Sequence, residues 1–144
     1  MKIFLDANIL VAVLNKEYPL FSLAARILSL VDDKRFSVYT SPLCLAIAFY
    51  FAEKKSGTAA AMKKISSLAS RILVAPAGSV EVKLALSSKQ IIDFEDGLEY
   101  YSALNVGCHV VITEETGDFY FSETEVLNCQ QFFEKYSSKG LIKD

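Results

Sequence analysis

The sequence predicts an α/β protein with a parallel sheet of four or five strands and helices on both faces. Short apolar runs suited to buried strands recur along the chain, and stretches with helical spacing of apolar residues lie between them. Strands that alternate with helices are joined by right-handed crossovers, which makes the sheet parallel. The 144 residues suffice for one domain with a hydrophobic core, and we expect a single domain over 1–144.

The first strand and the helix after it open the chain. "KIFLD" at 2–6 is a continuous apolar run ending in an acid, and "ANILVAVLN" at 7–15 predicts a short helix. Apolar residues recur every three or four positions over 18–33, which predicts a second helix. "RFSVYTS" at 35–41 predicts the second strand. The stretch 42–55 opens with proline and is apolar almost all round, so we expect a helix that is buried or lies in an interface.

The second half of the chain continues the alternation. A helix is predicted over 57–71, followed by the strand "ILVAP" and a helical pattern over 79–89. An amphipathic helix begins at Asp93 in "IIDFEDGLEYYSAL". The residues predicted to form its apolar face are Phe94, Leu98, Tyr101 and Leu104. The remaining elements are two strands and a short helix, at 108–113, 124–128 and 129–138.

Composition narrows the class of protein. Apolar residues make up 52% and charged residues 22%, which is typical of a globular chain. A formal net charge of -2 argues against a strongly basic nucleic-acid binder. The longest apolar runs, about a dozen residues, are too short to span a bilayer. Asp6 interrupts any secretory leader, and Cys44, Cys108 and Cys129 form no CxxC pair, so we expect reduced cysteines in a cytoplasmic protein.

Acidic residues gather at three points that the predicted fold brings to one edge of the sheet. Asp6 ends the first strand, and a helix leading into the fourth strand must begin near the carboxyl edge. The other acids open that helix or follow the fourth strand: Asp93, Glu95, Asp96, Glu114, Glu115 and Asp118. Two carboxylates about 4 Å apart repel by roughly 4 kcal/mol. Such a cluster favours protonation or a divalent cation.

The donor types indicate which cation. Carboxylate oxygens suit Mg²⁺ or Mn²⁺, whereas the lone His109 and scattered cysteines argue against zinc. A carboxylate-held metal suits phosphodiester hydrolysis. Simpler interpretations exist for most of these acids. Asp93 can be an N-cap, with Glu95 and Asp96 favoured by the helix dipole, and Asp6 can cap the helix after it. Glu114 and Glu115 can be solvated loop charges.

Three motifs resemble the PIN-domain family over nearly the whole chain. They are "IFLDANIL" with Asp6 and Asn8, "DFEDGLEYYSAL" with Asp96, and "VVITEETGDF" with Thr113, Glu115 and Asp118. The resemblance implies a three-layer α/β/α sandwich and a metal-dependent ribonuclease that acts on RNA. Asp6, Asp96, and Glu115 or Asp118 would bind Mg²⁺ or Mn²⁺. Supporting roles fall to Asn8, Asp93, Glu95 and Thr113, with Thr113 positioning the leaving strand or a metal-bound water.

Bacterial members of this family are often VapC-like toxins of toxin–antitoxin pairs and commonly form homodimers. The resemblance therefore implies a cognate antitoxin partner and a homodimer. We expect self-association through residues 42–52, which lack a polar face. A phosphatase-like or flavodoxin-like domain is a third interpretation, but the sequence has neither a glycine-rich phosphate loop nor a nucleophile motif.

The chain departs from the family pattern in three places. Ile47 stands where the family has an acid or an Asn, "EETG" replaces the usual basic and amide residues after Thr113, and Gly97 replaces a small alanine. An isoleucine offers no oxygen, so we expect Ile47 to weaken metal binding. Ile47 and the mildly acidic net charge favour an alternative function, a PIN-fold binding or interaction module with weak or no nuclease activity.

Overall fold

The computed structural model describes residues 1–142, and its centre is a five-stranded sheet in which every strand is parallel to its neighbours. The strands, in chain order, are β1 Lys2–Leu5, β2 Ser37–Thr40, β3 Leu73–Val74, β4 Val110–Ile112 and β5 Glu125–Leu127. Their order across the sheet is β3-β2-β1-β4-β5. The α/β prediction is confirmed, including the fifth strand.

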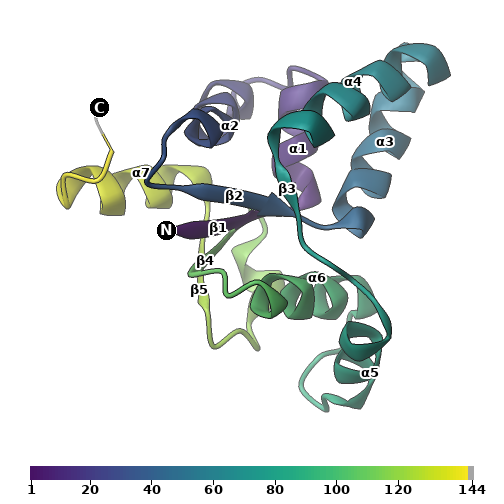
Figure 1. Cartoon of the computed structure of the whole chain (residues 1–144), viewed down its shortest axis with the longest axis vertical. Coiled ribbons are helices and arrows are strands. Elements are labelled where there is room, and N and C mark those ends of the chain that lie inside the picture. The colour runs from purple at the N-terminus through teal and green to yellow at the C-terminus, as the bar shows by residue number, and fades with distance from the viewer. Residues whose placement is uncertain (143–144) are drawn as a thin grey trace.

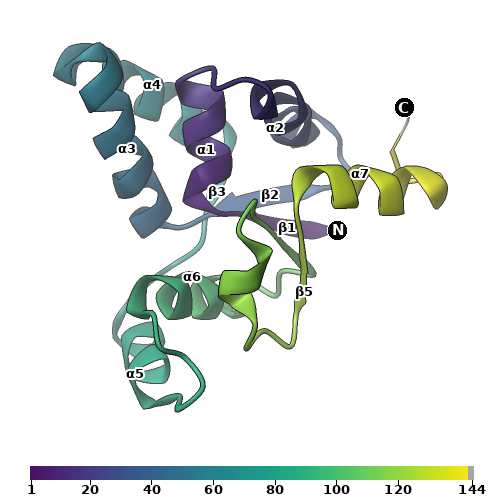
Figure 2. The ribbon, with the colours of Figure 1, turned by 180° about the vertical axis from the view of Figure 1, so that it is seen from behind.

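The helices form a layer on each side of this sheet. They are α1 Ala7–Leu14, α2 Leu20–Leu28, α3 Pro42–Ser56, α4 Thr58–Arg71, α5 Ser79–Ser87, α6 Phe94–Asn105 and α7 Cys129–Ser138, with short 3-10 helices η1 Ser29–Asp32 and η2 Thr116–Phe119. Helices α1 to α4 lie on one side of the sheet, and α5 and α6 lie on the other (Figures 1 and 2). The predicted α/β/α sandwich is confirmed. The single helix predicted over 18–33 is instead α2 followed by η1.

Three helices begin at the carboxyl edge of the sheet because polar side chains cap them there. Asp6 accepts a hydrogen bond from Ala7 N at 2.6 Å at the start of α1. Ser41 Oγ accepts from Cys44 N at 3.1 Å at the start of α3, which has proline in its first turn. The Asp93 carboxylate caps α6. The first turns of α1, α3 and α6 therefore lie at the same edge.

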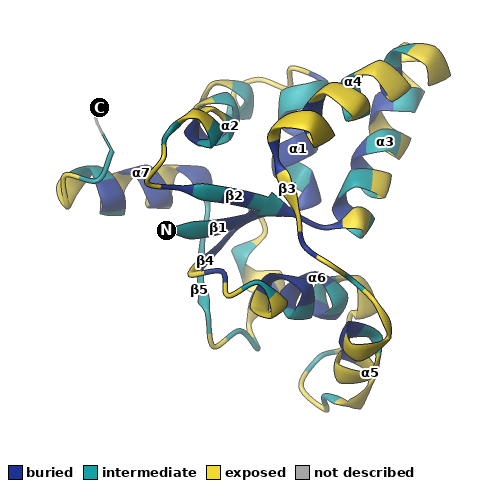
Figure 3. Cartoon of the chain, in the orientation of Figure 1, coloured by how far each residue is buried: buried dark blue, intermediate teal, exposed yellow. Residues whose placement is uncertain are grey.

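The core lies between the central strands and the two helix layers, as the dark blue segments of Figure 3 show. Every residue of β4 is fully buried, and so are Ile3, Phe4 and Leu5 of β1. All three cysteines are buried and unpaired, as expected for core residues. Within residues 1–142, no helix is both long and apolar enough to cross a membrane.

The predicted core face of α6 is wrong. Phe94 and Leu104 are 44% and 39% exposed, and the side that packs inward carries Gly97, Tyr100 and Ala103. Gly97 permits close contact on the buried side of α6. A Cβ at position 97 would lie 2.7 Å from Ile91 Cγ2, so a larger residue would force Ile91, in the segment before α6, to shift.

Candidate metal centre

A pocket of about 550 Å³ opens at the carboxyl edge of the sheet, between α1, α3, α6 and η2. Seven acidic side chains line this acid pocket: Asp6, Glu17, Glu95, Asp96, Glu99, Glu115 and Asp118. The pocket has neither lysine nor arginine among the described residues that line it. Carboxylates so concentrated and without basic partners repel one another, and a bound cation relieves that repulsion.

Most of the acids singled out in the sequence meet in this pocket. Asp6, Asp96, Glu115 and Asp118 all line it, as do two of the predicted supporting residues, Asn8 and Glu95. They come from the end of β1, the start of α6 and the segment around η2. The fold thus joins positions more than a hundred residues apart in the chain.

Asp93 and Glu114 hold helices instead of lining the pocket. The Asp93 carboxylate accepts from Asp96 N at 3.1 Å and caps α6, the simpler of its two interpretations. Glu114 Oε2 accepts from Cys129 N at 3.1 Å at the start of α7. Glu114 is exposed, as expected of a solvated loop charge, and its bond with Cys129 N is an additional role.

A hydrogen-bond network fixes the Asp6 carboxylate. Thr113 is fully buried, and its hydroxyl donates to Asp6 Oδ2 at 2.7 Å. The same hydroxyl oxygen accepts from Asn8 Nδ2 at 3.0 Å and from Glu115 N at 3.1 Å. Asn8 Oδ1 in turn accepts from Glu114 N at 3.2 Å. Thr113 thus orients Asp6 and connects it to the loop of Glu115.

The mutual repulsion of the acids is visible in their pKa values. Burial, followed by the charges of Asp93, Asp6 and Asp118, raises the pKa of Asp96 to about 7. A hydrogen bond with Asp118 raises the pKa of Glu115, and the charge of Asp118 adds to the effect. These groups therefore hold protons more tightly than isolated carboxyls, as expected where negative charge lacks a cation.

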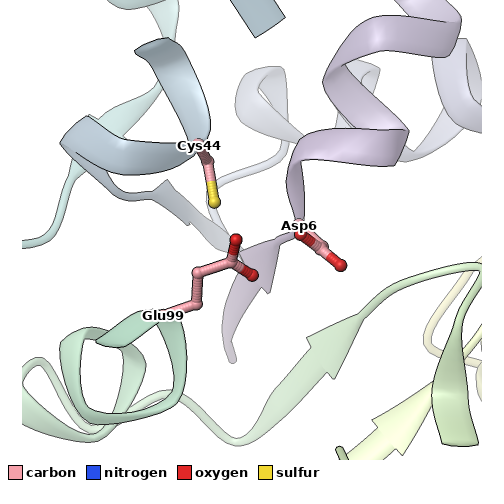
Figure 4. Close-up of side chains that lie close together, drawn as sticks. All are labelled: Asp6, Cys44 and Glu99. Carbon is pink, nitrogen blue, oxygen red and sulfur yellow. The ribbon is translucent and has the colours of Figure 1, made fainter. Parts of the chain in front are cut away.

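One acid beside Asp6, Glu99, was not predicted from the sequence. Glu99 lies three residues after Asp96 on α6, is 3% exposed, and has its carboxyl beside Asp6 and Cys44 (Figure 4). The ligand atoms of Asp6, Cys44 and Glu99 all lie within 4.8 Å of one another. Within residues 1–142 no other three His, Cys, Asp or Glu side chains bring their ligand atoms so close.

Burial, and then the charge of Asp6, raises the pKa of Glu99 to about 11. Burial also raises the pKa of the Cys44 thiol, which is 0% exposed. One signal in the sequence could have found Glu99: an acid at i+3 from Asp96 shares its helical face. Cys44 offered no such signal, because a cysteine in an apolar run has the same pattern as a core residue.

One wall of the acid pocket is apolar. Ile47 and Phe51 of α3 line it, and Tyr18 lies on the loop before α2. Position 47 therefore faces the site, as the sequence predicted, and contributes no oxygen. Tyr18, Tyr50 and Phe51 are 71%, 52% and 44% exposed, so α3 is partly uncovered in the single chain.

The donor set of the pocket fits a hard divalent cation. All seven acidic side chains offer oxygen, histidine is absent from the described lining residues, and Asp6 is already oriented by hydrogen bonds. Glu99 Oε2 is buried without a hydrogen-bond partner among the described residues, so it has a free lone pair inside the site. Buried polar atoms rarely lack a partner unless a missing group supplies one.

The family assignment follows from a model that matches residues 2–117 and describes a PIN domain. The chain belongs to the PIN domain family. The matched span of this PIN domain includes Asp6, Asp96, Glu99 and Glu115 and ends directly before Asp118.

Known proteins similar to this PIN domain carry VapC names. Ribonuclease VapC1 of Aquifex aeolicus (strain VF5) is 24% identical over 141 residues, covering 95% of this chain and 96% of that protein. The structure of VapBC-1 from nontypeable Haemophilus influenzae matches with a TM-score of 0.68 and 20% identity, over 90% of this chain and 99% of that one. VapBC2 from Rickettsia felis, bound to a DNA fragment from its promoter, matches with a TM-score of 0.65 and 20% identity, over 89% and 98%. The two structures share the fold of this chain.

Proposed function

We propose that this PIN domain is a metal-dependent endoribonuclease and the toxin of a toxin–antitoxin pair. The observation that carries the proposal is the acid pocket, where seven acidic side chains meet with no basic partner among the described lining residues. Such a pocket repels RNA unless a cation is bound, because RNA is itself a polyanion. The similarity to Ribonuclease VapC1 supports RNA as the substrate.

Asp6, Asp96, Glu115 and Asp118 would hold Mg²⁺ or Mn²⁺, with Asn8 and Glu95 beside them. A cation bound there neutralises charge on the phosphate and lowers the pKa of a bound water. Asp6 is the most constrained of these acids. The bonds from Ala7 N and Thr113 Oγ1 fix its carboxylate before any ligand arrives, so little reorganisation is needed on binding.

The apolar wall suggests how this toxin meets its protein partners. Tyr50 and Phe51 project from α3 and remain exposed, although a soluble surface seldom presents adjacent large aromatic side chains. We expect α3 to be covered by a second copy of the chain or by an antitoxin. We also expect the protein to act in the cytoplasm, where free thiols such as its three buried cysteines stay reduced.

The test is cleavage of a structured RNA by the full chain with Mn²⁺, followed on a gel. Asp6→Asn should lower the rate by about a hundredfold or more, since it removes one anionic oxygen at the centre of the site. Asp32→Asn is the matched control, because Asp32 lies outside the pocket and pairs with Arg71. Equal cleavage by wild type and Asp6→Asn would contradict the proposal.

A second candidate function is a PIN-fold binding module without nuclease activity. Ile47 favours it, because this side chain occupies the pocket wall without offering an oxygen. Mn²⁺ binding without RNA cleavage, together with tight binding of an antitoxin, would support this second function over the first.

A further inference from the structure

Glu99 is buried in a way that a purely structural glutamate seldom is. The side chain is 3% exposed, and its Oε2 atom has no hydrogen-bond partner among residues 1–142. Only one other buried side-chain atom of the described chain shares this property, Asn15 Oδ1. Burying a carboxyl without partners is costly, and the cost is larger when the group is charged. A folded chain keeps such a group only where something else satisfies it.

The neighbours of Glu99 are acceptors and a weak donor. Figure 4 shows the Glu99 carboxyl, carried by α6, in the space between Cys44 at the start of α3 and Asp6 at the end of β1. The ligand atoms of the three side chains lie within 4.8 Å of one another. Two carboxylates at this separation repel so strongly in a buried site that both cannot be ionised without a cation between them. Cys44 donates at most one weak S–H bond, which leaves lone pairs of both carboxyl groups free.

The apolar wall explains why the site needs a donor from α6. Ile47 lies three residues after Cys44, so both residues face the site from the same side of α3, and neither carries an oxygen. Glu99 reaches into this space from α6 (Figure 4). It follows Asp96 by about one helical turn and is more buried than Asp96. The Glu99 carboxyl therefore supplies an oxygen on the side of the site where α3 offers no oxygen ligand.

We infer that Glu99 is a metal ligand of the acid pocket and, with Asp6, binds the divalent cation at the inner end of the site. This inference deepens the proposed function and depends on it, since both require a divalent cation in the pocket. Asp6 and Glu99 supply one oxygen each at the inner end. Asp96, Glu115 and Asp118 lie around them and can hold the remaining waters of the ion.

The decisive experiment measures Mn²⁺ binding to the full chain by calorimetry, with no RNA present. Glu99→Gln keeps the shape of the side chain and removes the anionic oxygen, so it should weaken Mn²⁺ binding by about tenfold or more. Glu81→Gln is the matched control, because Glu81 is equally buried, at 4% exposed, but lies outside the pocket. Glu81→Gln should bind Mn²⁺ within about twofold of wild type.

Thermal melts in the presence of a chelator distinguish a ligand from a structural residue. A ligand role predicts that metal-free Glu99→Gln melts at the same or a higher temperature than wild type and gains less stability from added Mn²⁺. A lower metal-free melting temperature with an unchanged response to Mn²⁺ would overturn the inference. Wild-type Mn²⁺ affinity in Glu99→Gln would overturn it as well.

A crystal of the wild-type protein soaked in Mn²⁺ needs no variant. Anomalous density within about 2–2.5 Å of a Glu99 oxygen would support the inference, and density held only by the other acids would overturn it. The proposed function has a separate outcome. Loss of Mn²⁺ binding in Asp6→Asn but not in Glu99→Gln would leave the function intact and remove Glu99 from it. If Mn²⁺ binding requires Glu99 but the protein cleaves no RNA, Glu99 remains a metal ligand and the proposed ribonuclease function is contradicted.

Discussion

Two buried glutamates of this chain have opposite surroundings. Glu81, at the start of α5, is 4% exposed and fully paired: Oε2 accepts from Gly78 N at 3.1 Å, and Oε1 accepts from Asn105 Nδ2 at 2.7 Å. Glu99, on α6, is 3% exposed and has an unpaired Oε2 beside another carboxylate. Burial alone therefore does not separate a structural acid from a functional one; the chemistry of its neighbours does.

The distinction has a thermodynamic meaning. Donors surround Glu81, so its carboxylate replaces lost water with N–H groups and holds α5 against α6. Glu99 faces Asp6, so the metal-free fold carries an unfavourable term that a cation can remove. Each prediction below tests one side of this contrast, and the expected changes decrease in size.

The largest change should come from removing the paired acid. Glu81→Ala leaves Gly78 N and Asn105 Nδ2 without their acceptor in a partly buried site, and it also removes the cap of α5. We expect the free energy of unfolding to fall by about 2–4 kcal/mol. Urea denaturation followed by circular dichroism measures it. A loss below about 0.5 kcal/mol would mean that Glu81 is not structural and would end the contrast.

The unpaired acid should behave in the opposite way. With a chelator present, Glu99→Gln should raise the free energy of unfolding by about 1–2 kcal/mol, because it replaces a buried carboxyl that must take up a proton on folding with an amide that is neutral in both states and can donate to Asp6. The same urea titration applies, and Glu81→Gln is again the control. A destabilised Glu99→Gln would place the two glutamates in the same structural class.

The response to pH tests the wider pocket. The pKa of Asp96 is raised from 3.8 to about 7, so the folded protein binds more protons than the unfolded chain between those values. The contribution of Asp96 to stability is therefore largest below about pH 4 and declines as pH rises to about 7. We expect Asp96→Asn to remove a decline of about 1 kcal/mol, a figure reduced for the partial exposure of this carboxyl. Chelated samples melted at several pH values measure the slope. An identical slope in both proteins would show that Asp96 lies in an ordinary, well-solvated environment.

The smallest change concerns the apolar wall. From the sequence, Ile47→Glu should tighten Mn²⁺ binding, since the isoleucine offers no ligand. With Glu99 already at the inner end of the pocket, we expect the gain to be less than about threefold in affinity, or about 0.7 kcal/mol. Calorimetry on Ile47→Glu and on Ile47→Glu/Glu99→Gln decides. A large gain in the single variant would mean that Glu99 does not fill the ligand position that Ile47 leaves empty.

Sequence patterns were sufficient for the sheet and for the outer acids. Buried parallel strands read as continuous apolar runs, and Asp6 is the polar residue that ends such a run. Placing Asp96 and Glu115 at the same edge needed only the rule that helices between parallel strands run back across the sheet. The roles of these acids as metal ligands stay a prediction.

The inner end of the pocket was not predictable in the same way. Glu99 sits in "GLEYYSAL", where one acid among apolar residues has the pattern of a solvated helix face. Its burial results from the orientation of α6, whose buried side also carries the small residues Gly97 and Ala103. Helical periodicity predicted that the face with Phe94 and Leu104 is buried. In the structure those two residues are exposed, and the buried face is the one that carries the small residues of α6.

The pairing of β1 with β4 determines when this site can exist during synthesis. Ile3 pairs with Val110, so β1 cannot complete its pairing until a strand more than a hundred residues later has been synthesised. Contacts so distant in sequence close slowly, and a growing chain cannot close them before the second partner has left the ribosome. Asp6 therefore remains separated from Thr113 and Asp118 until residues 110–118 have been made and can fold. A nascent chain that lacks these residues has no complete pocket.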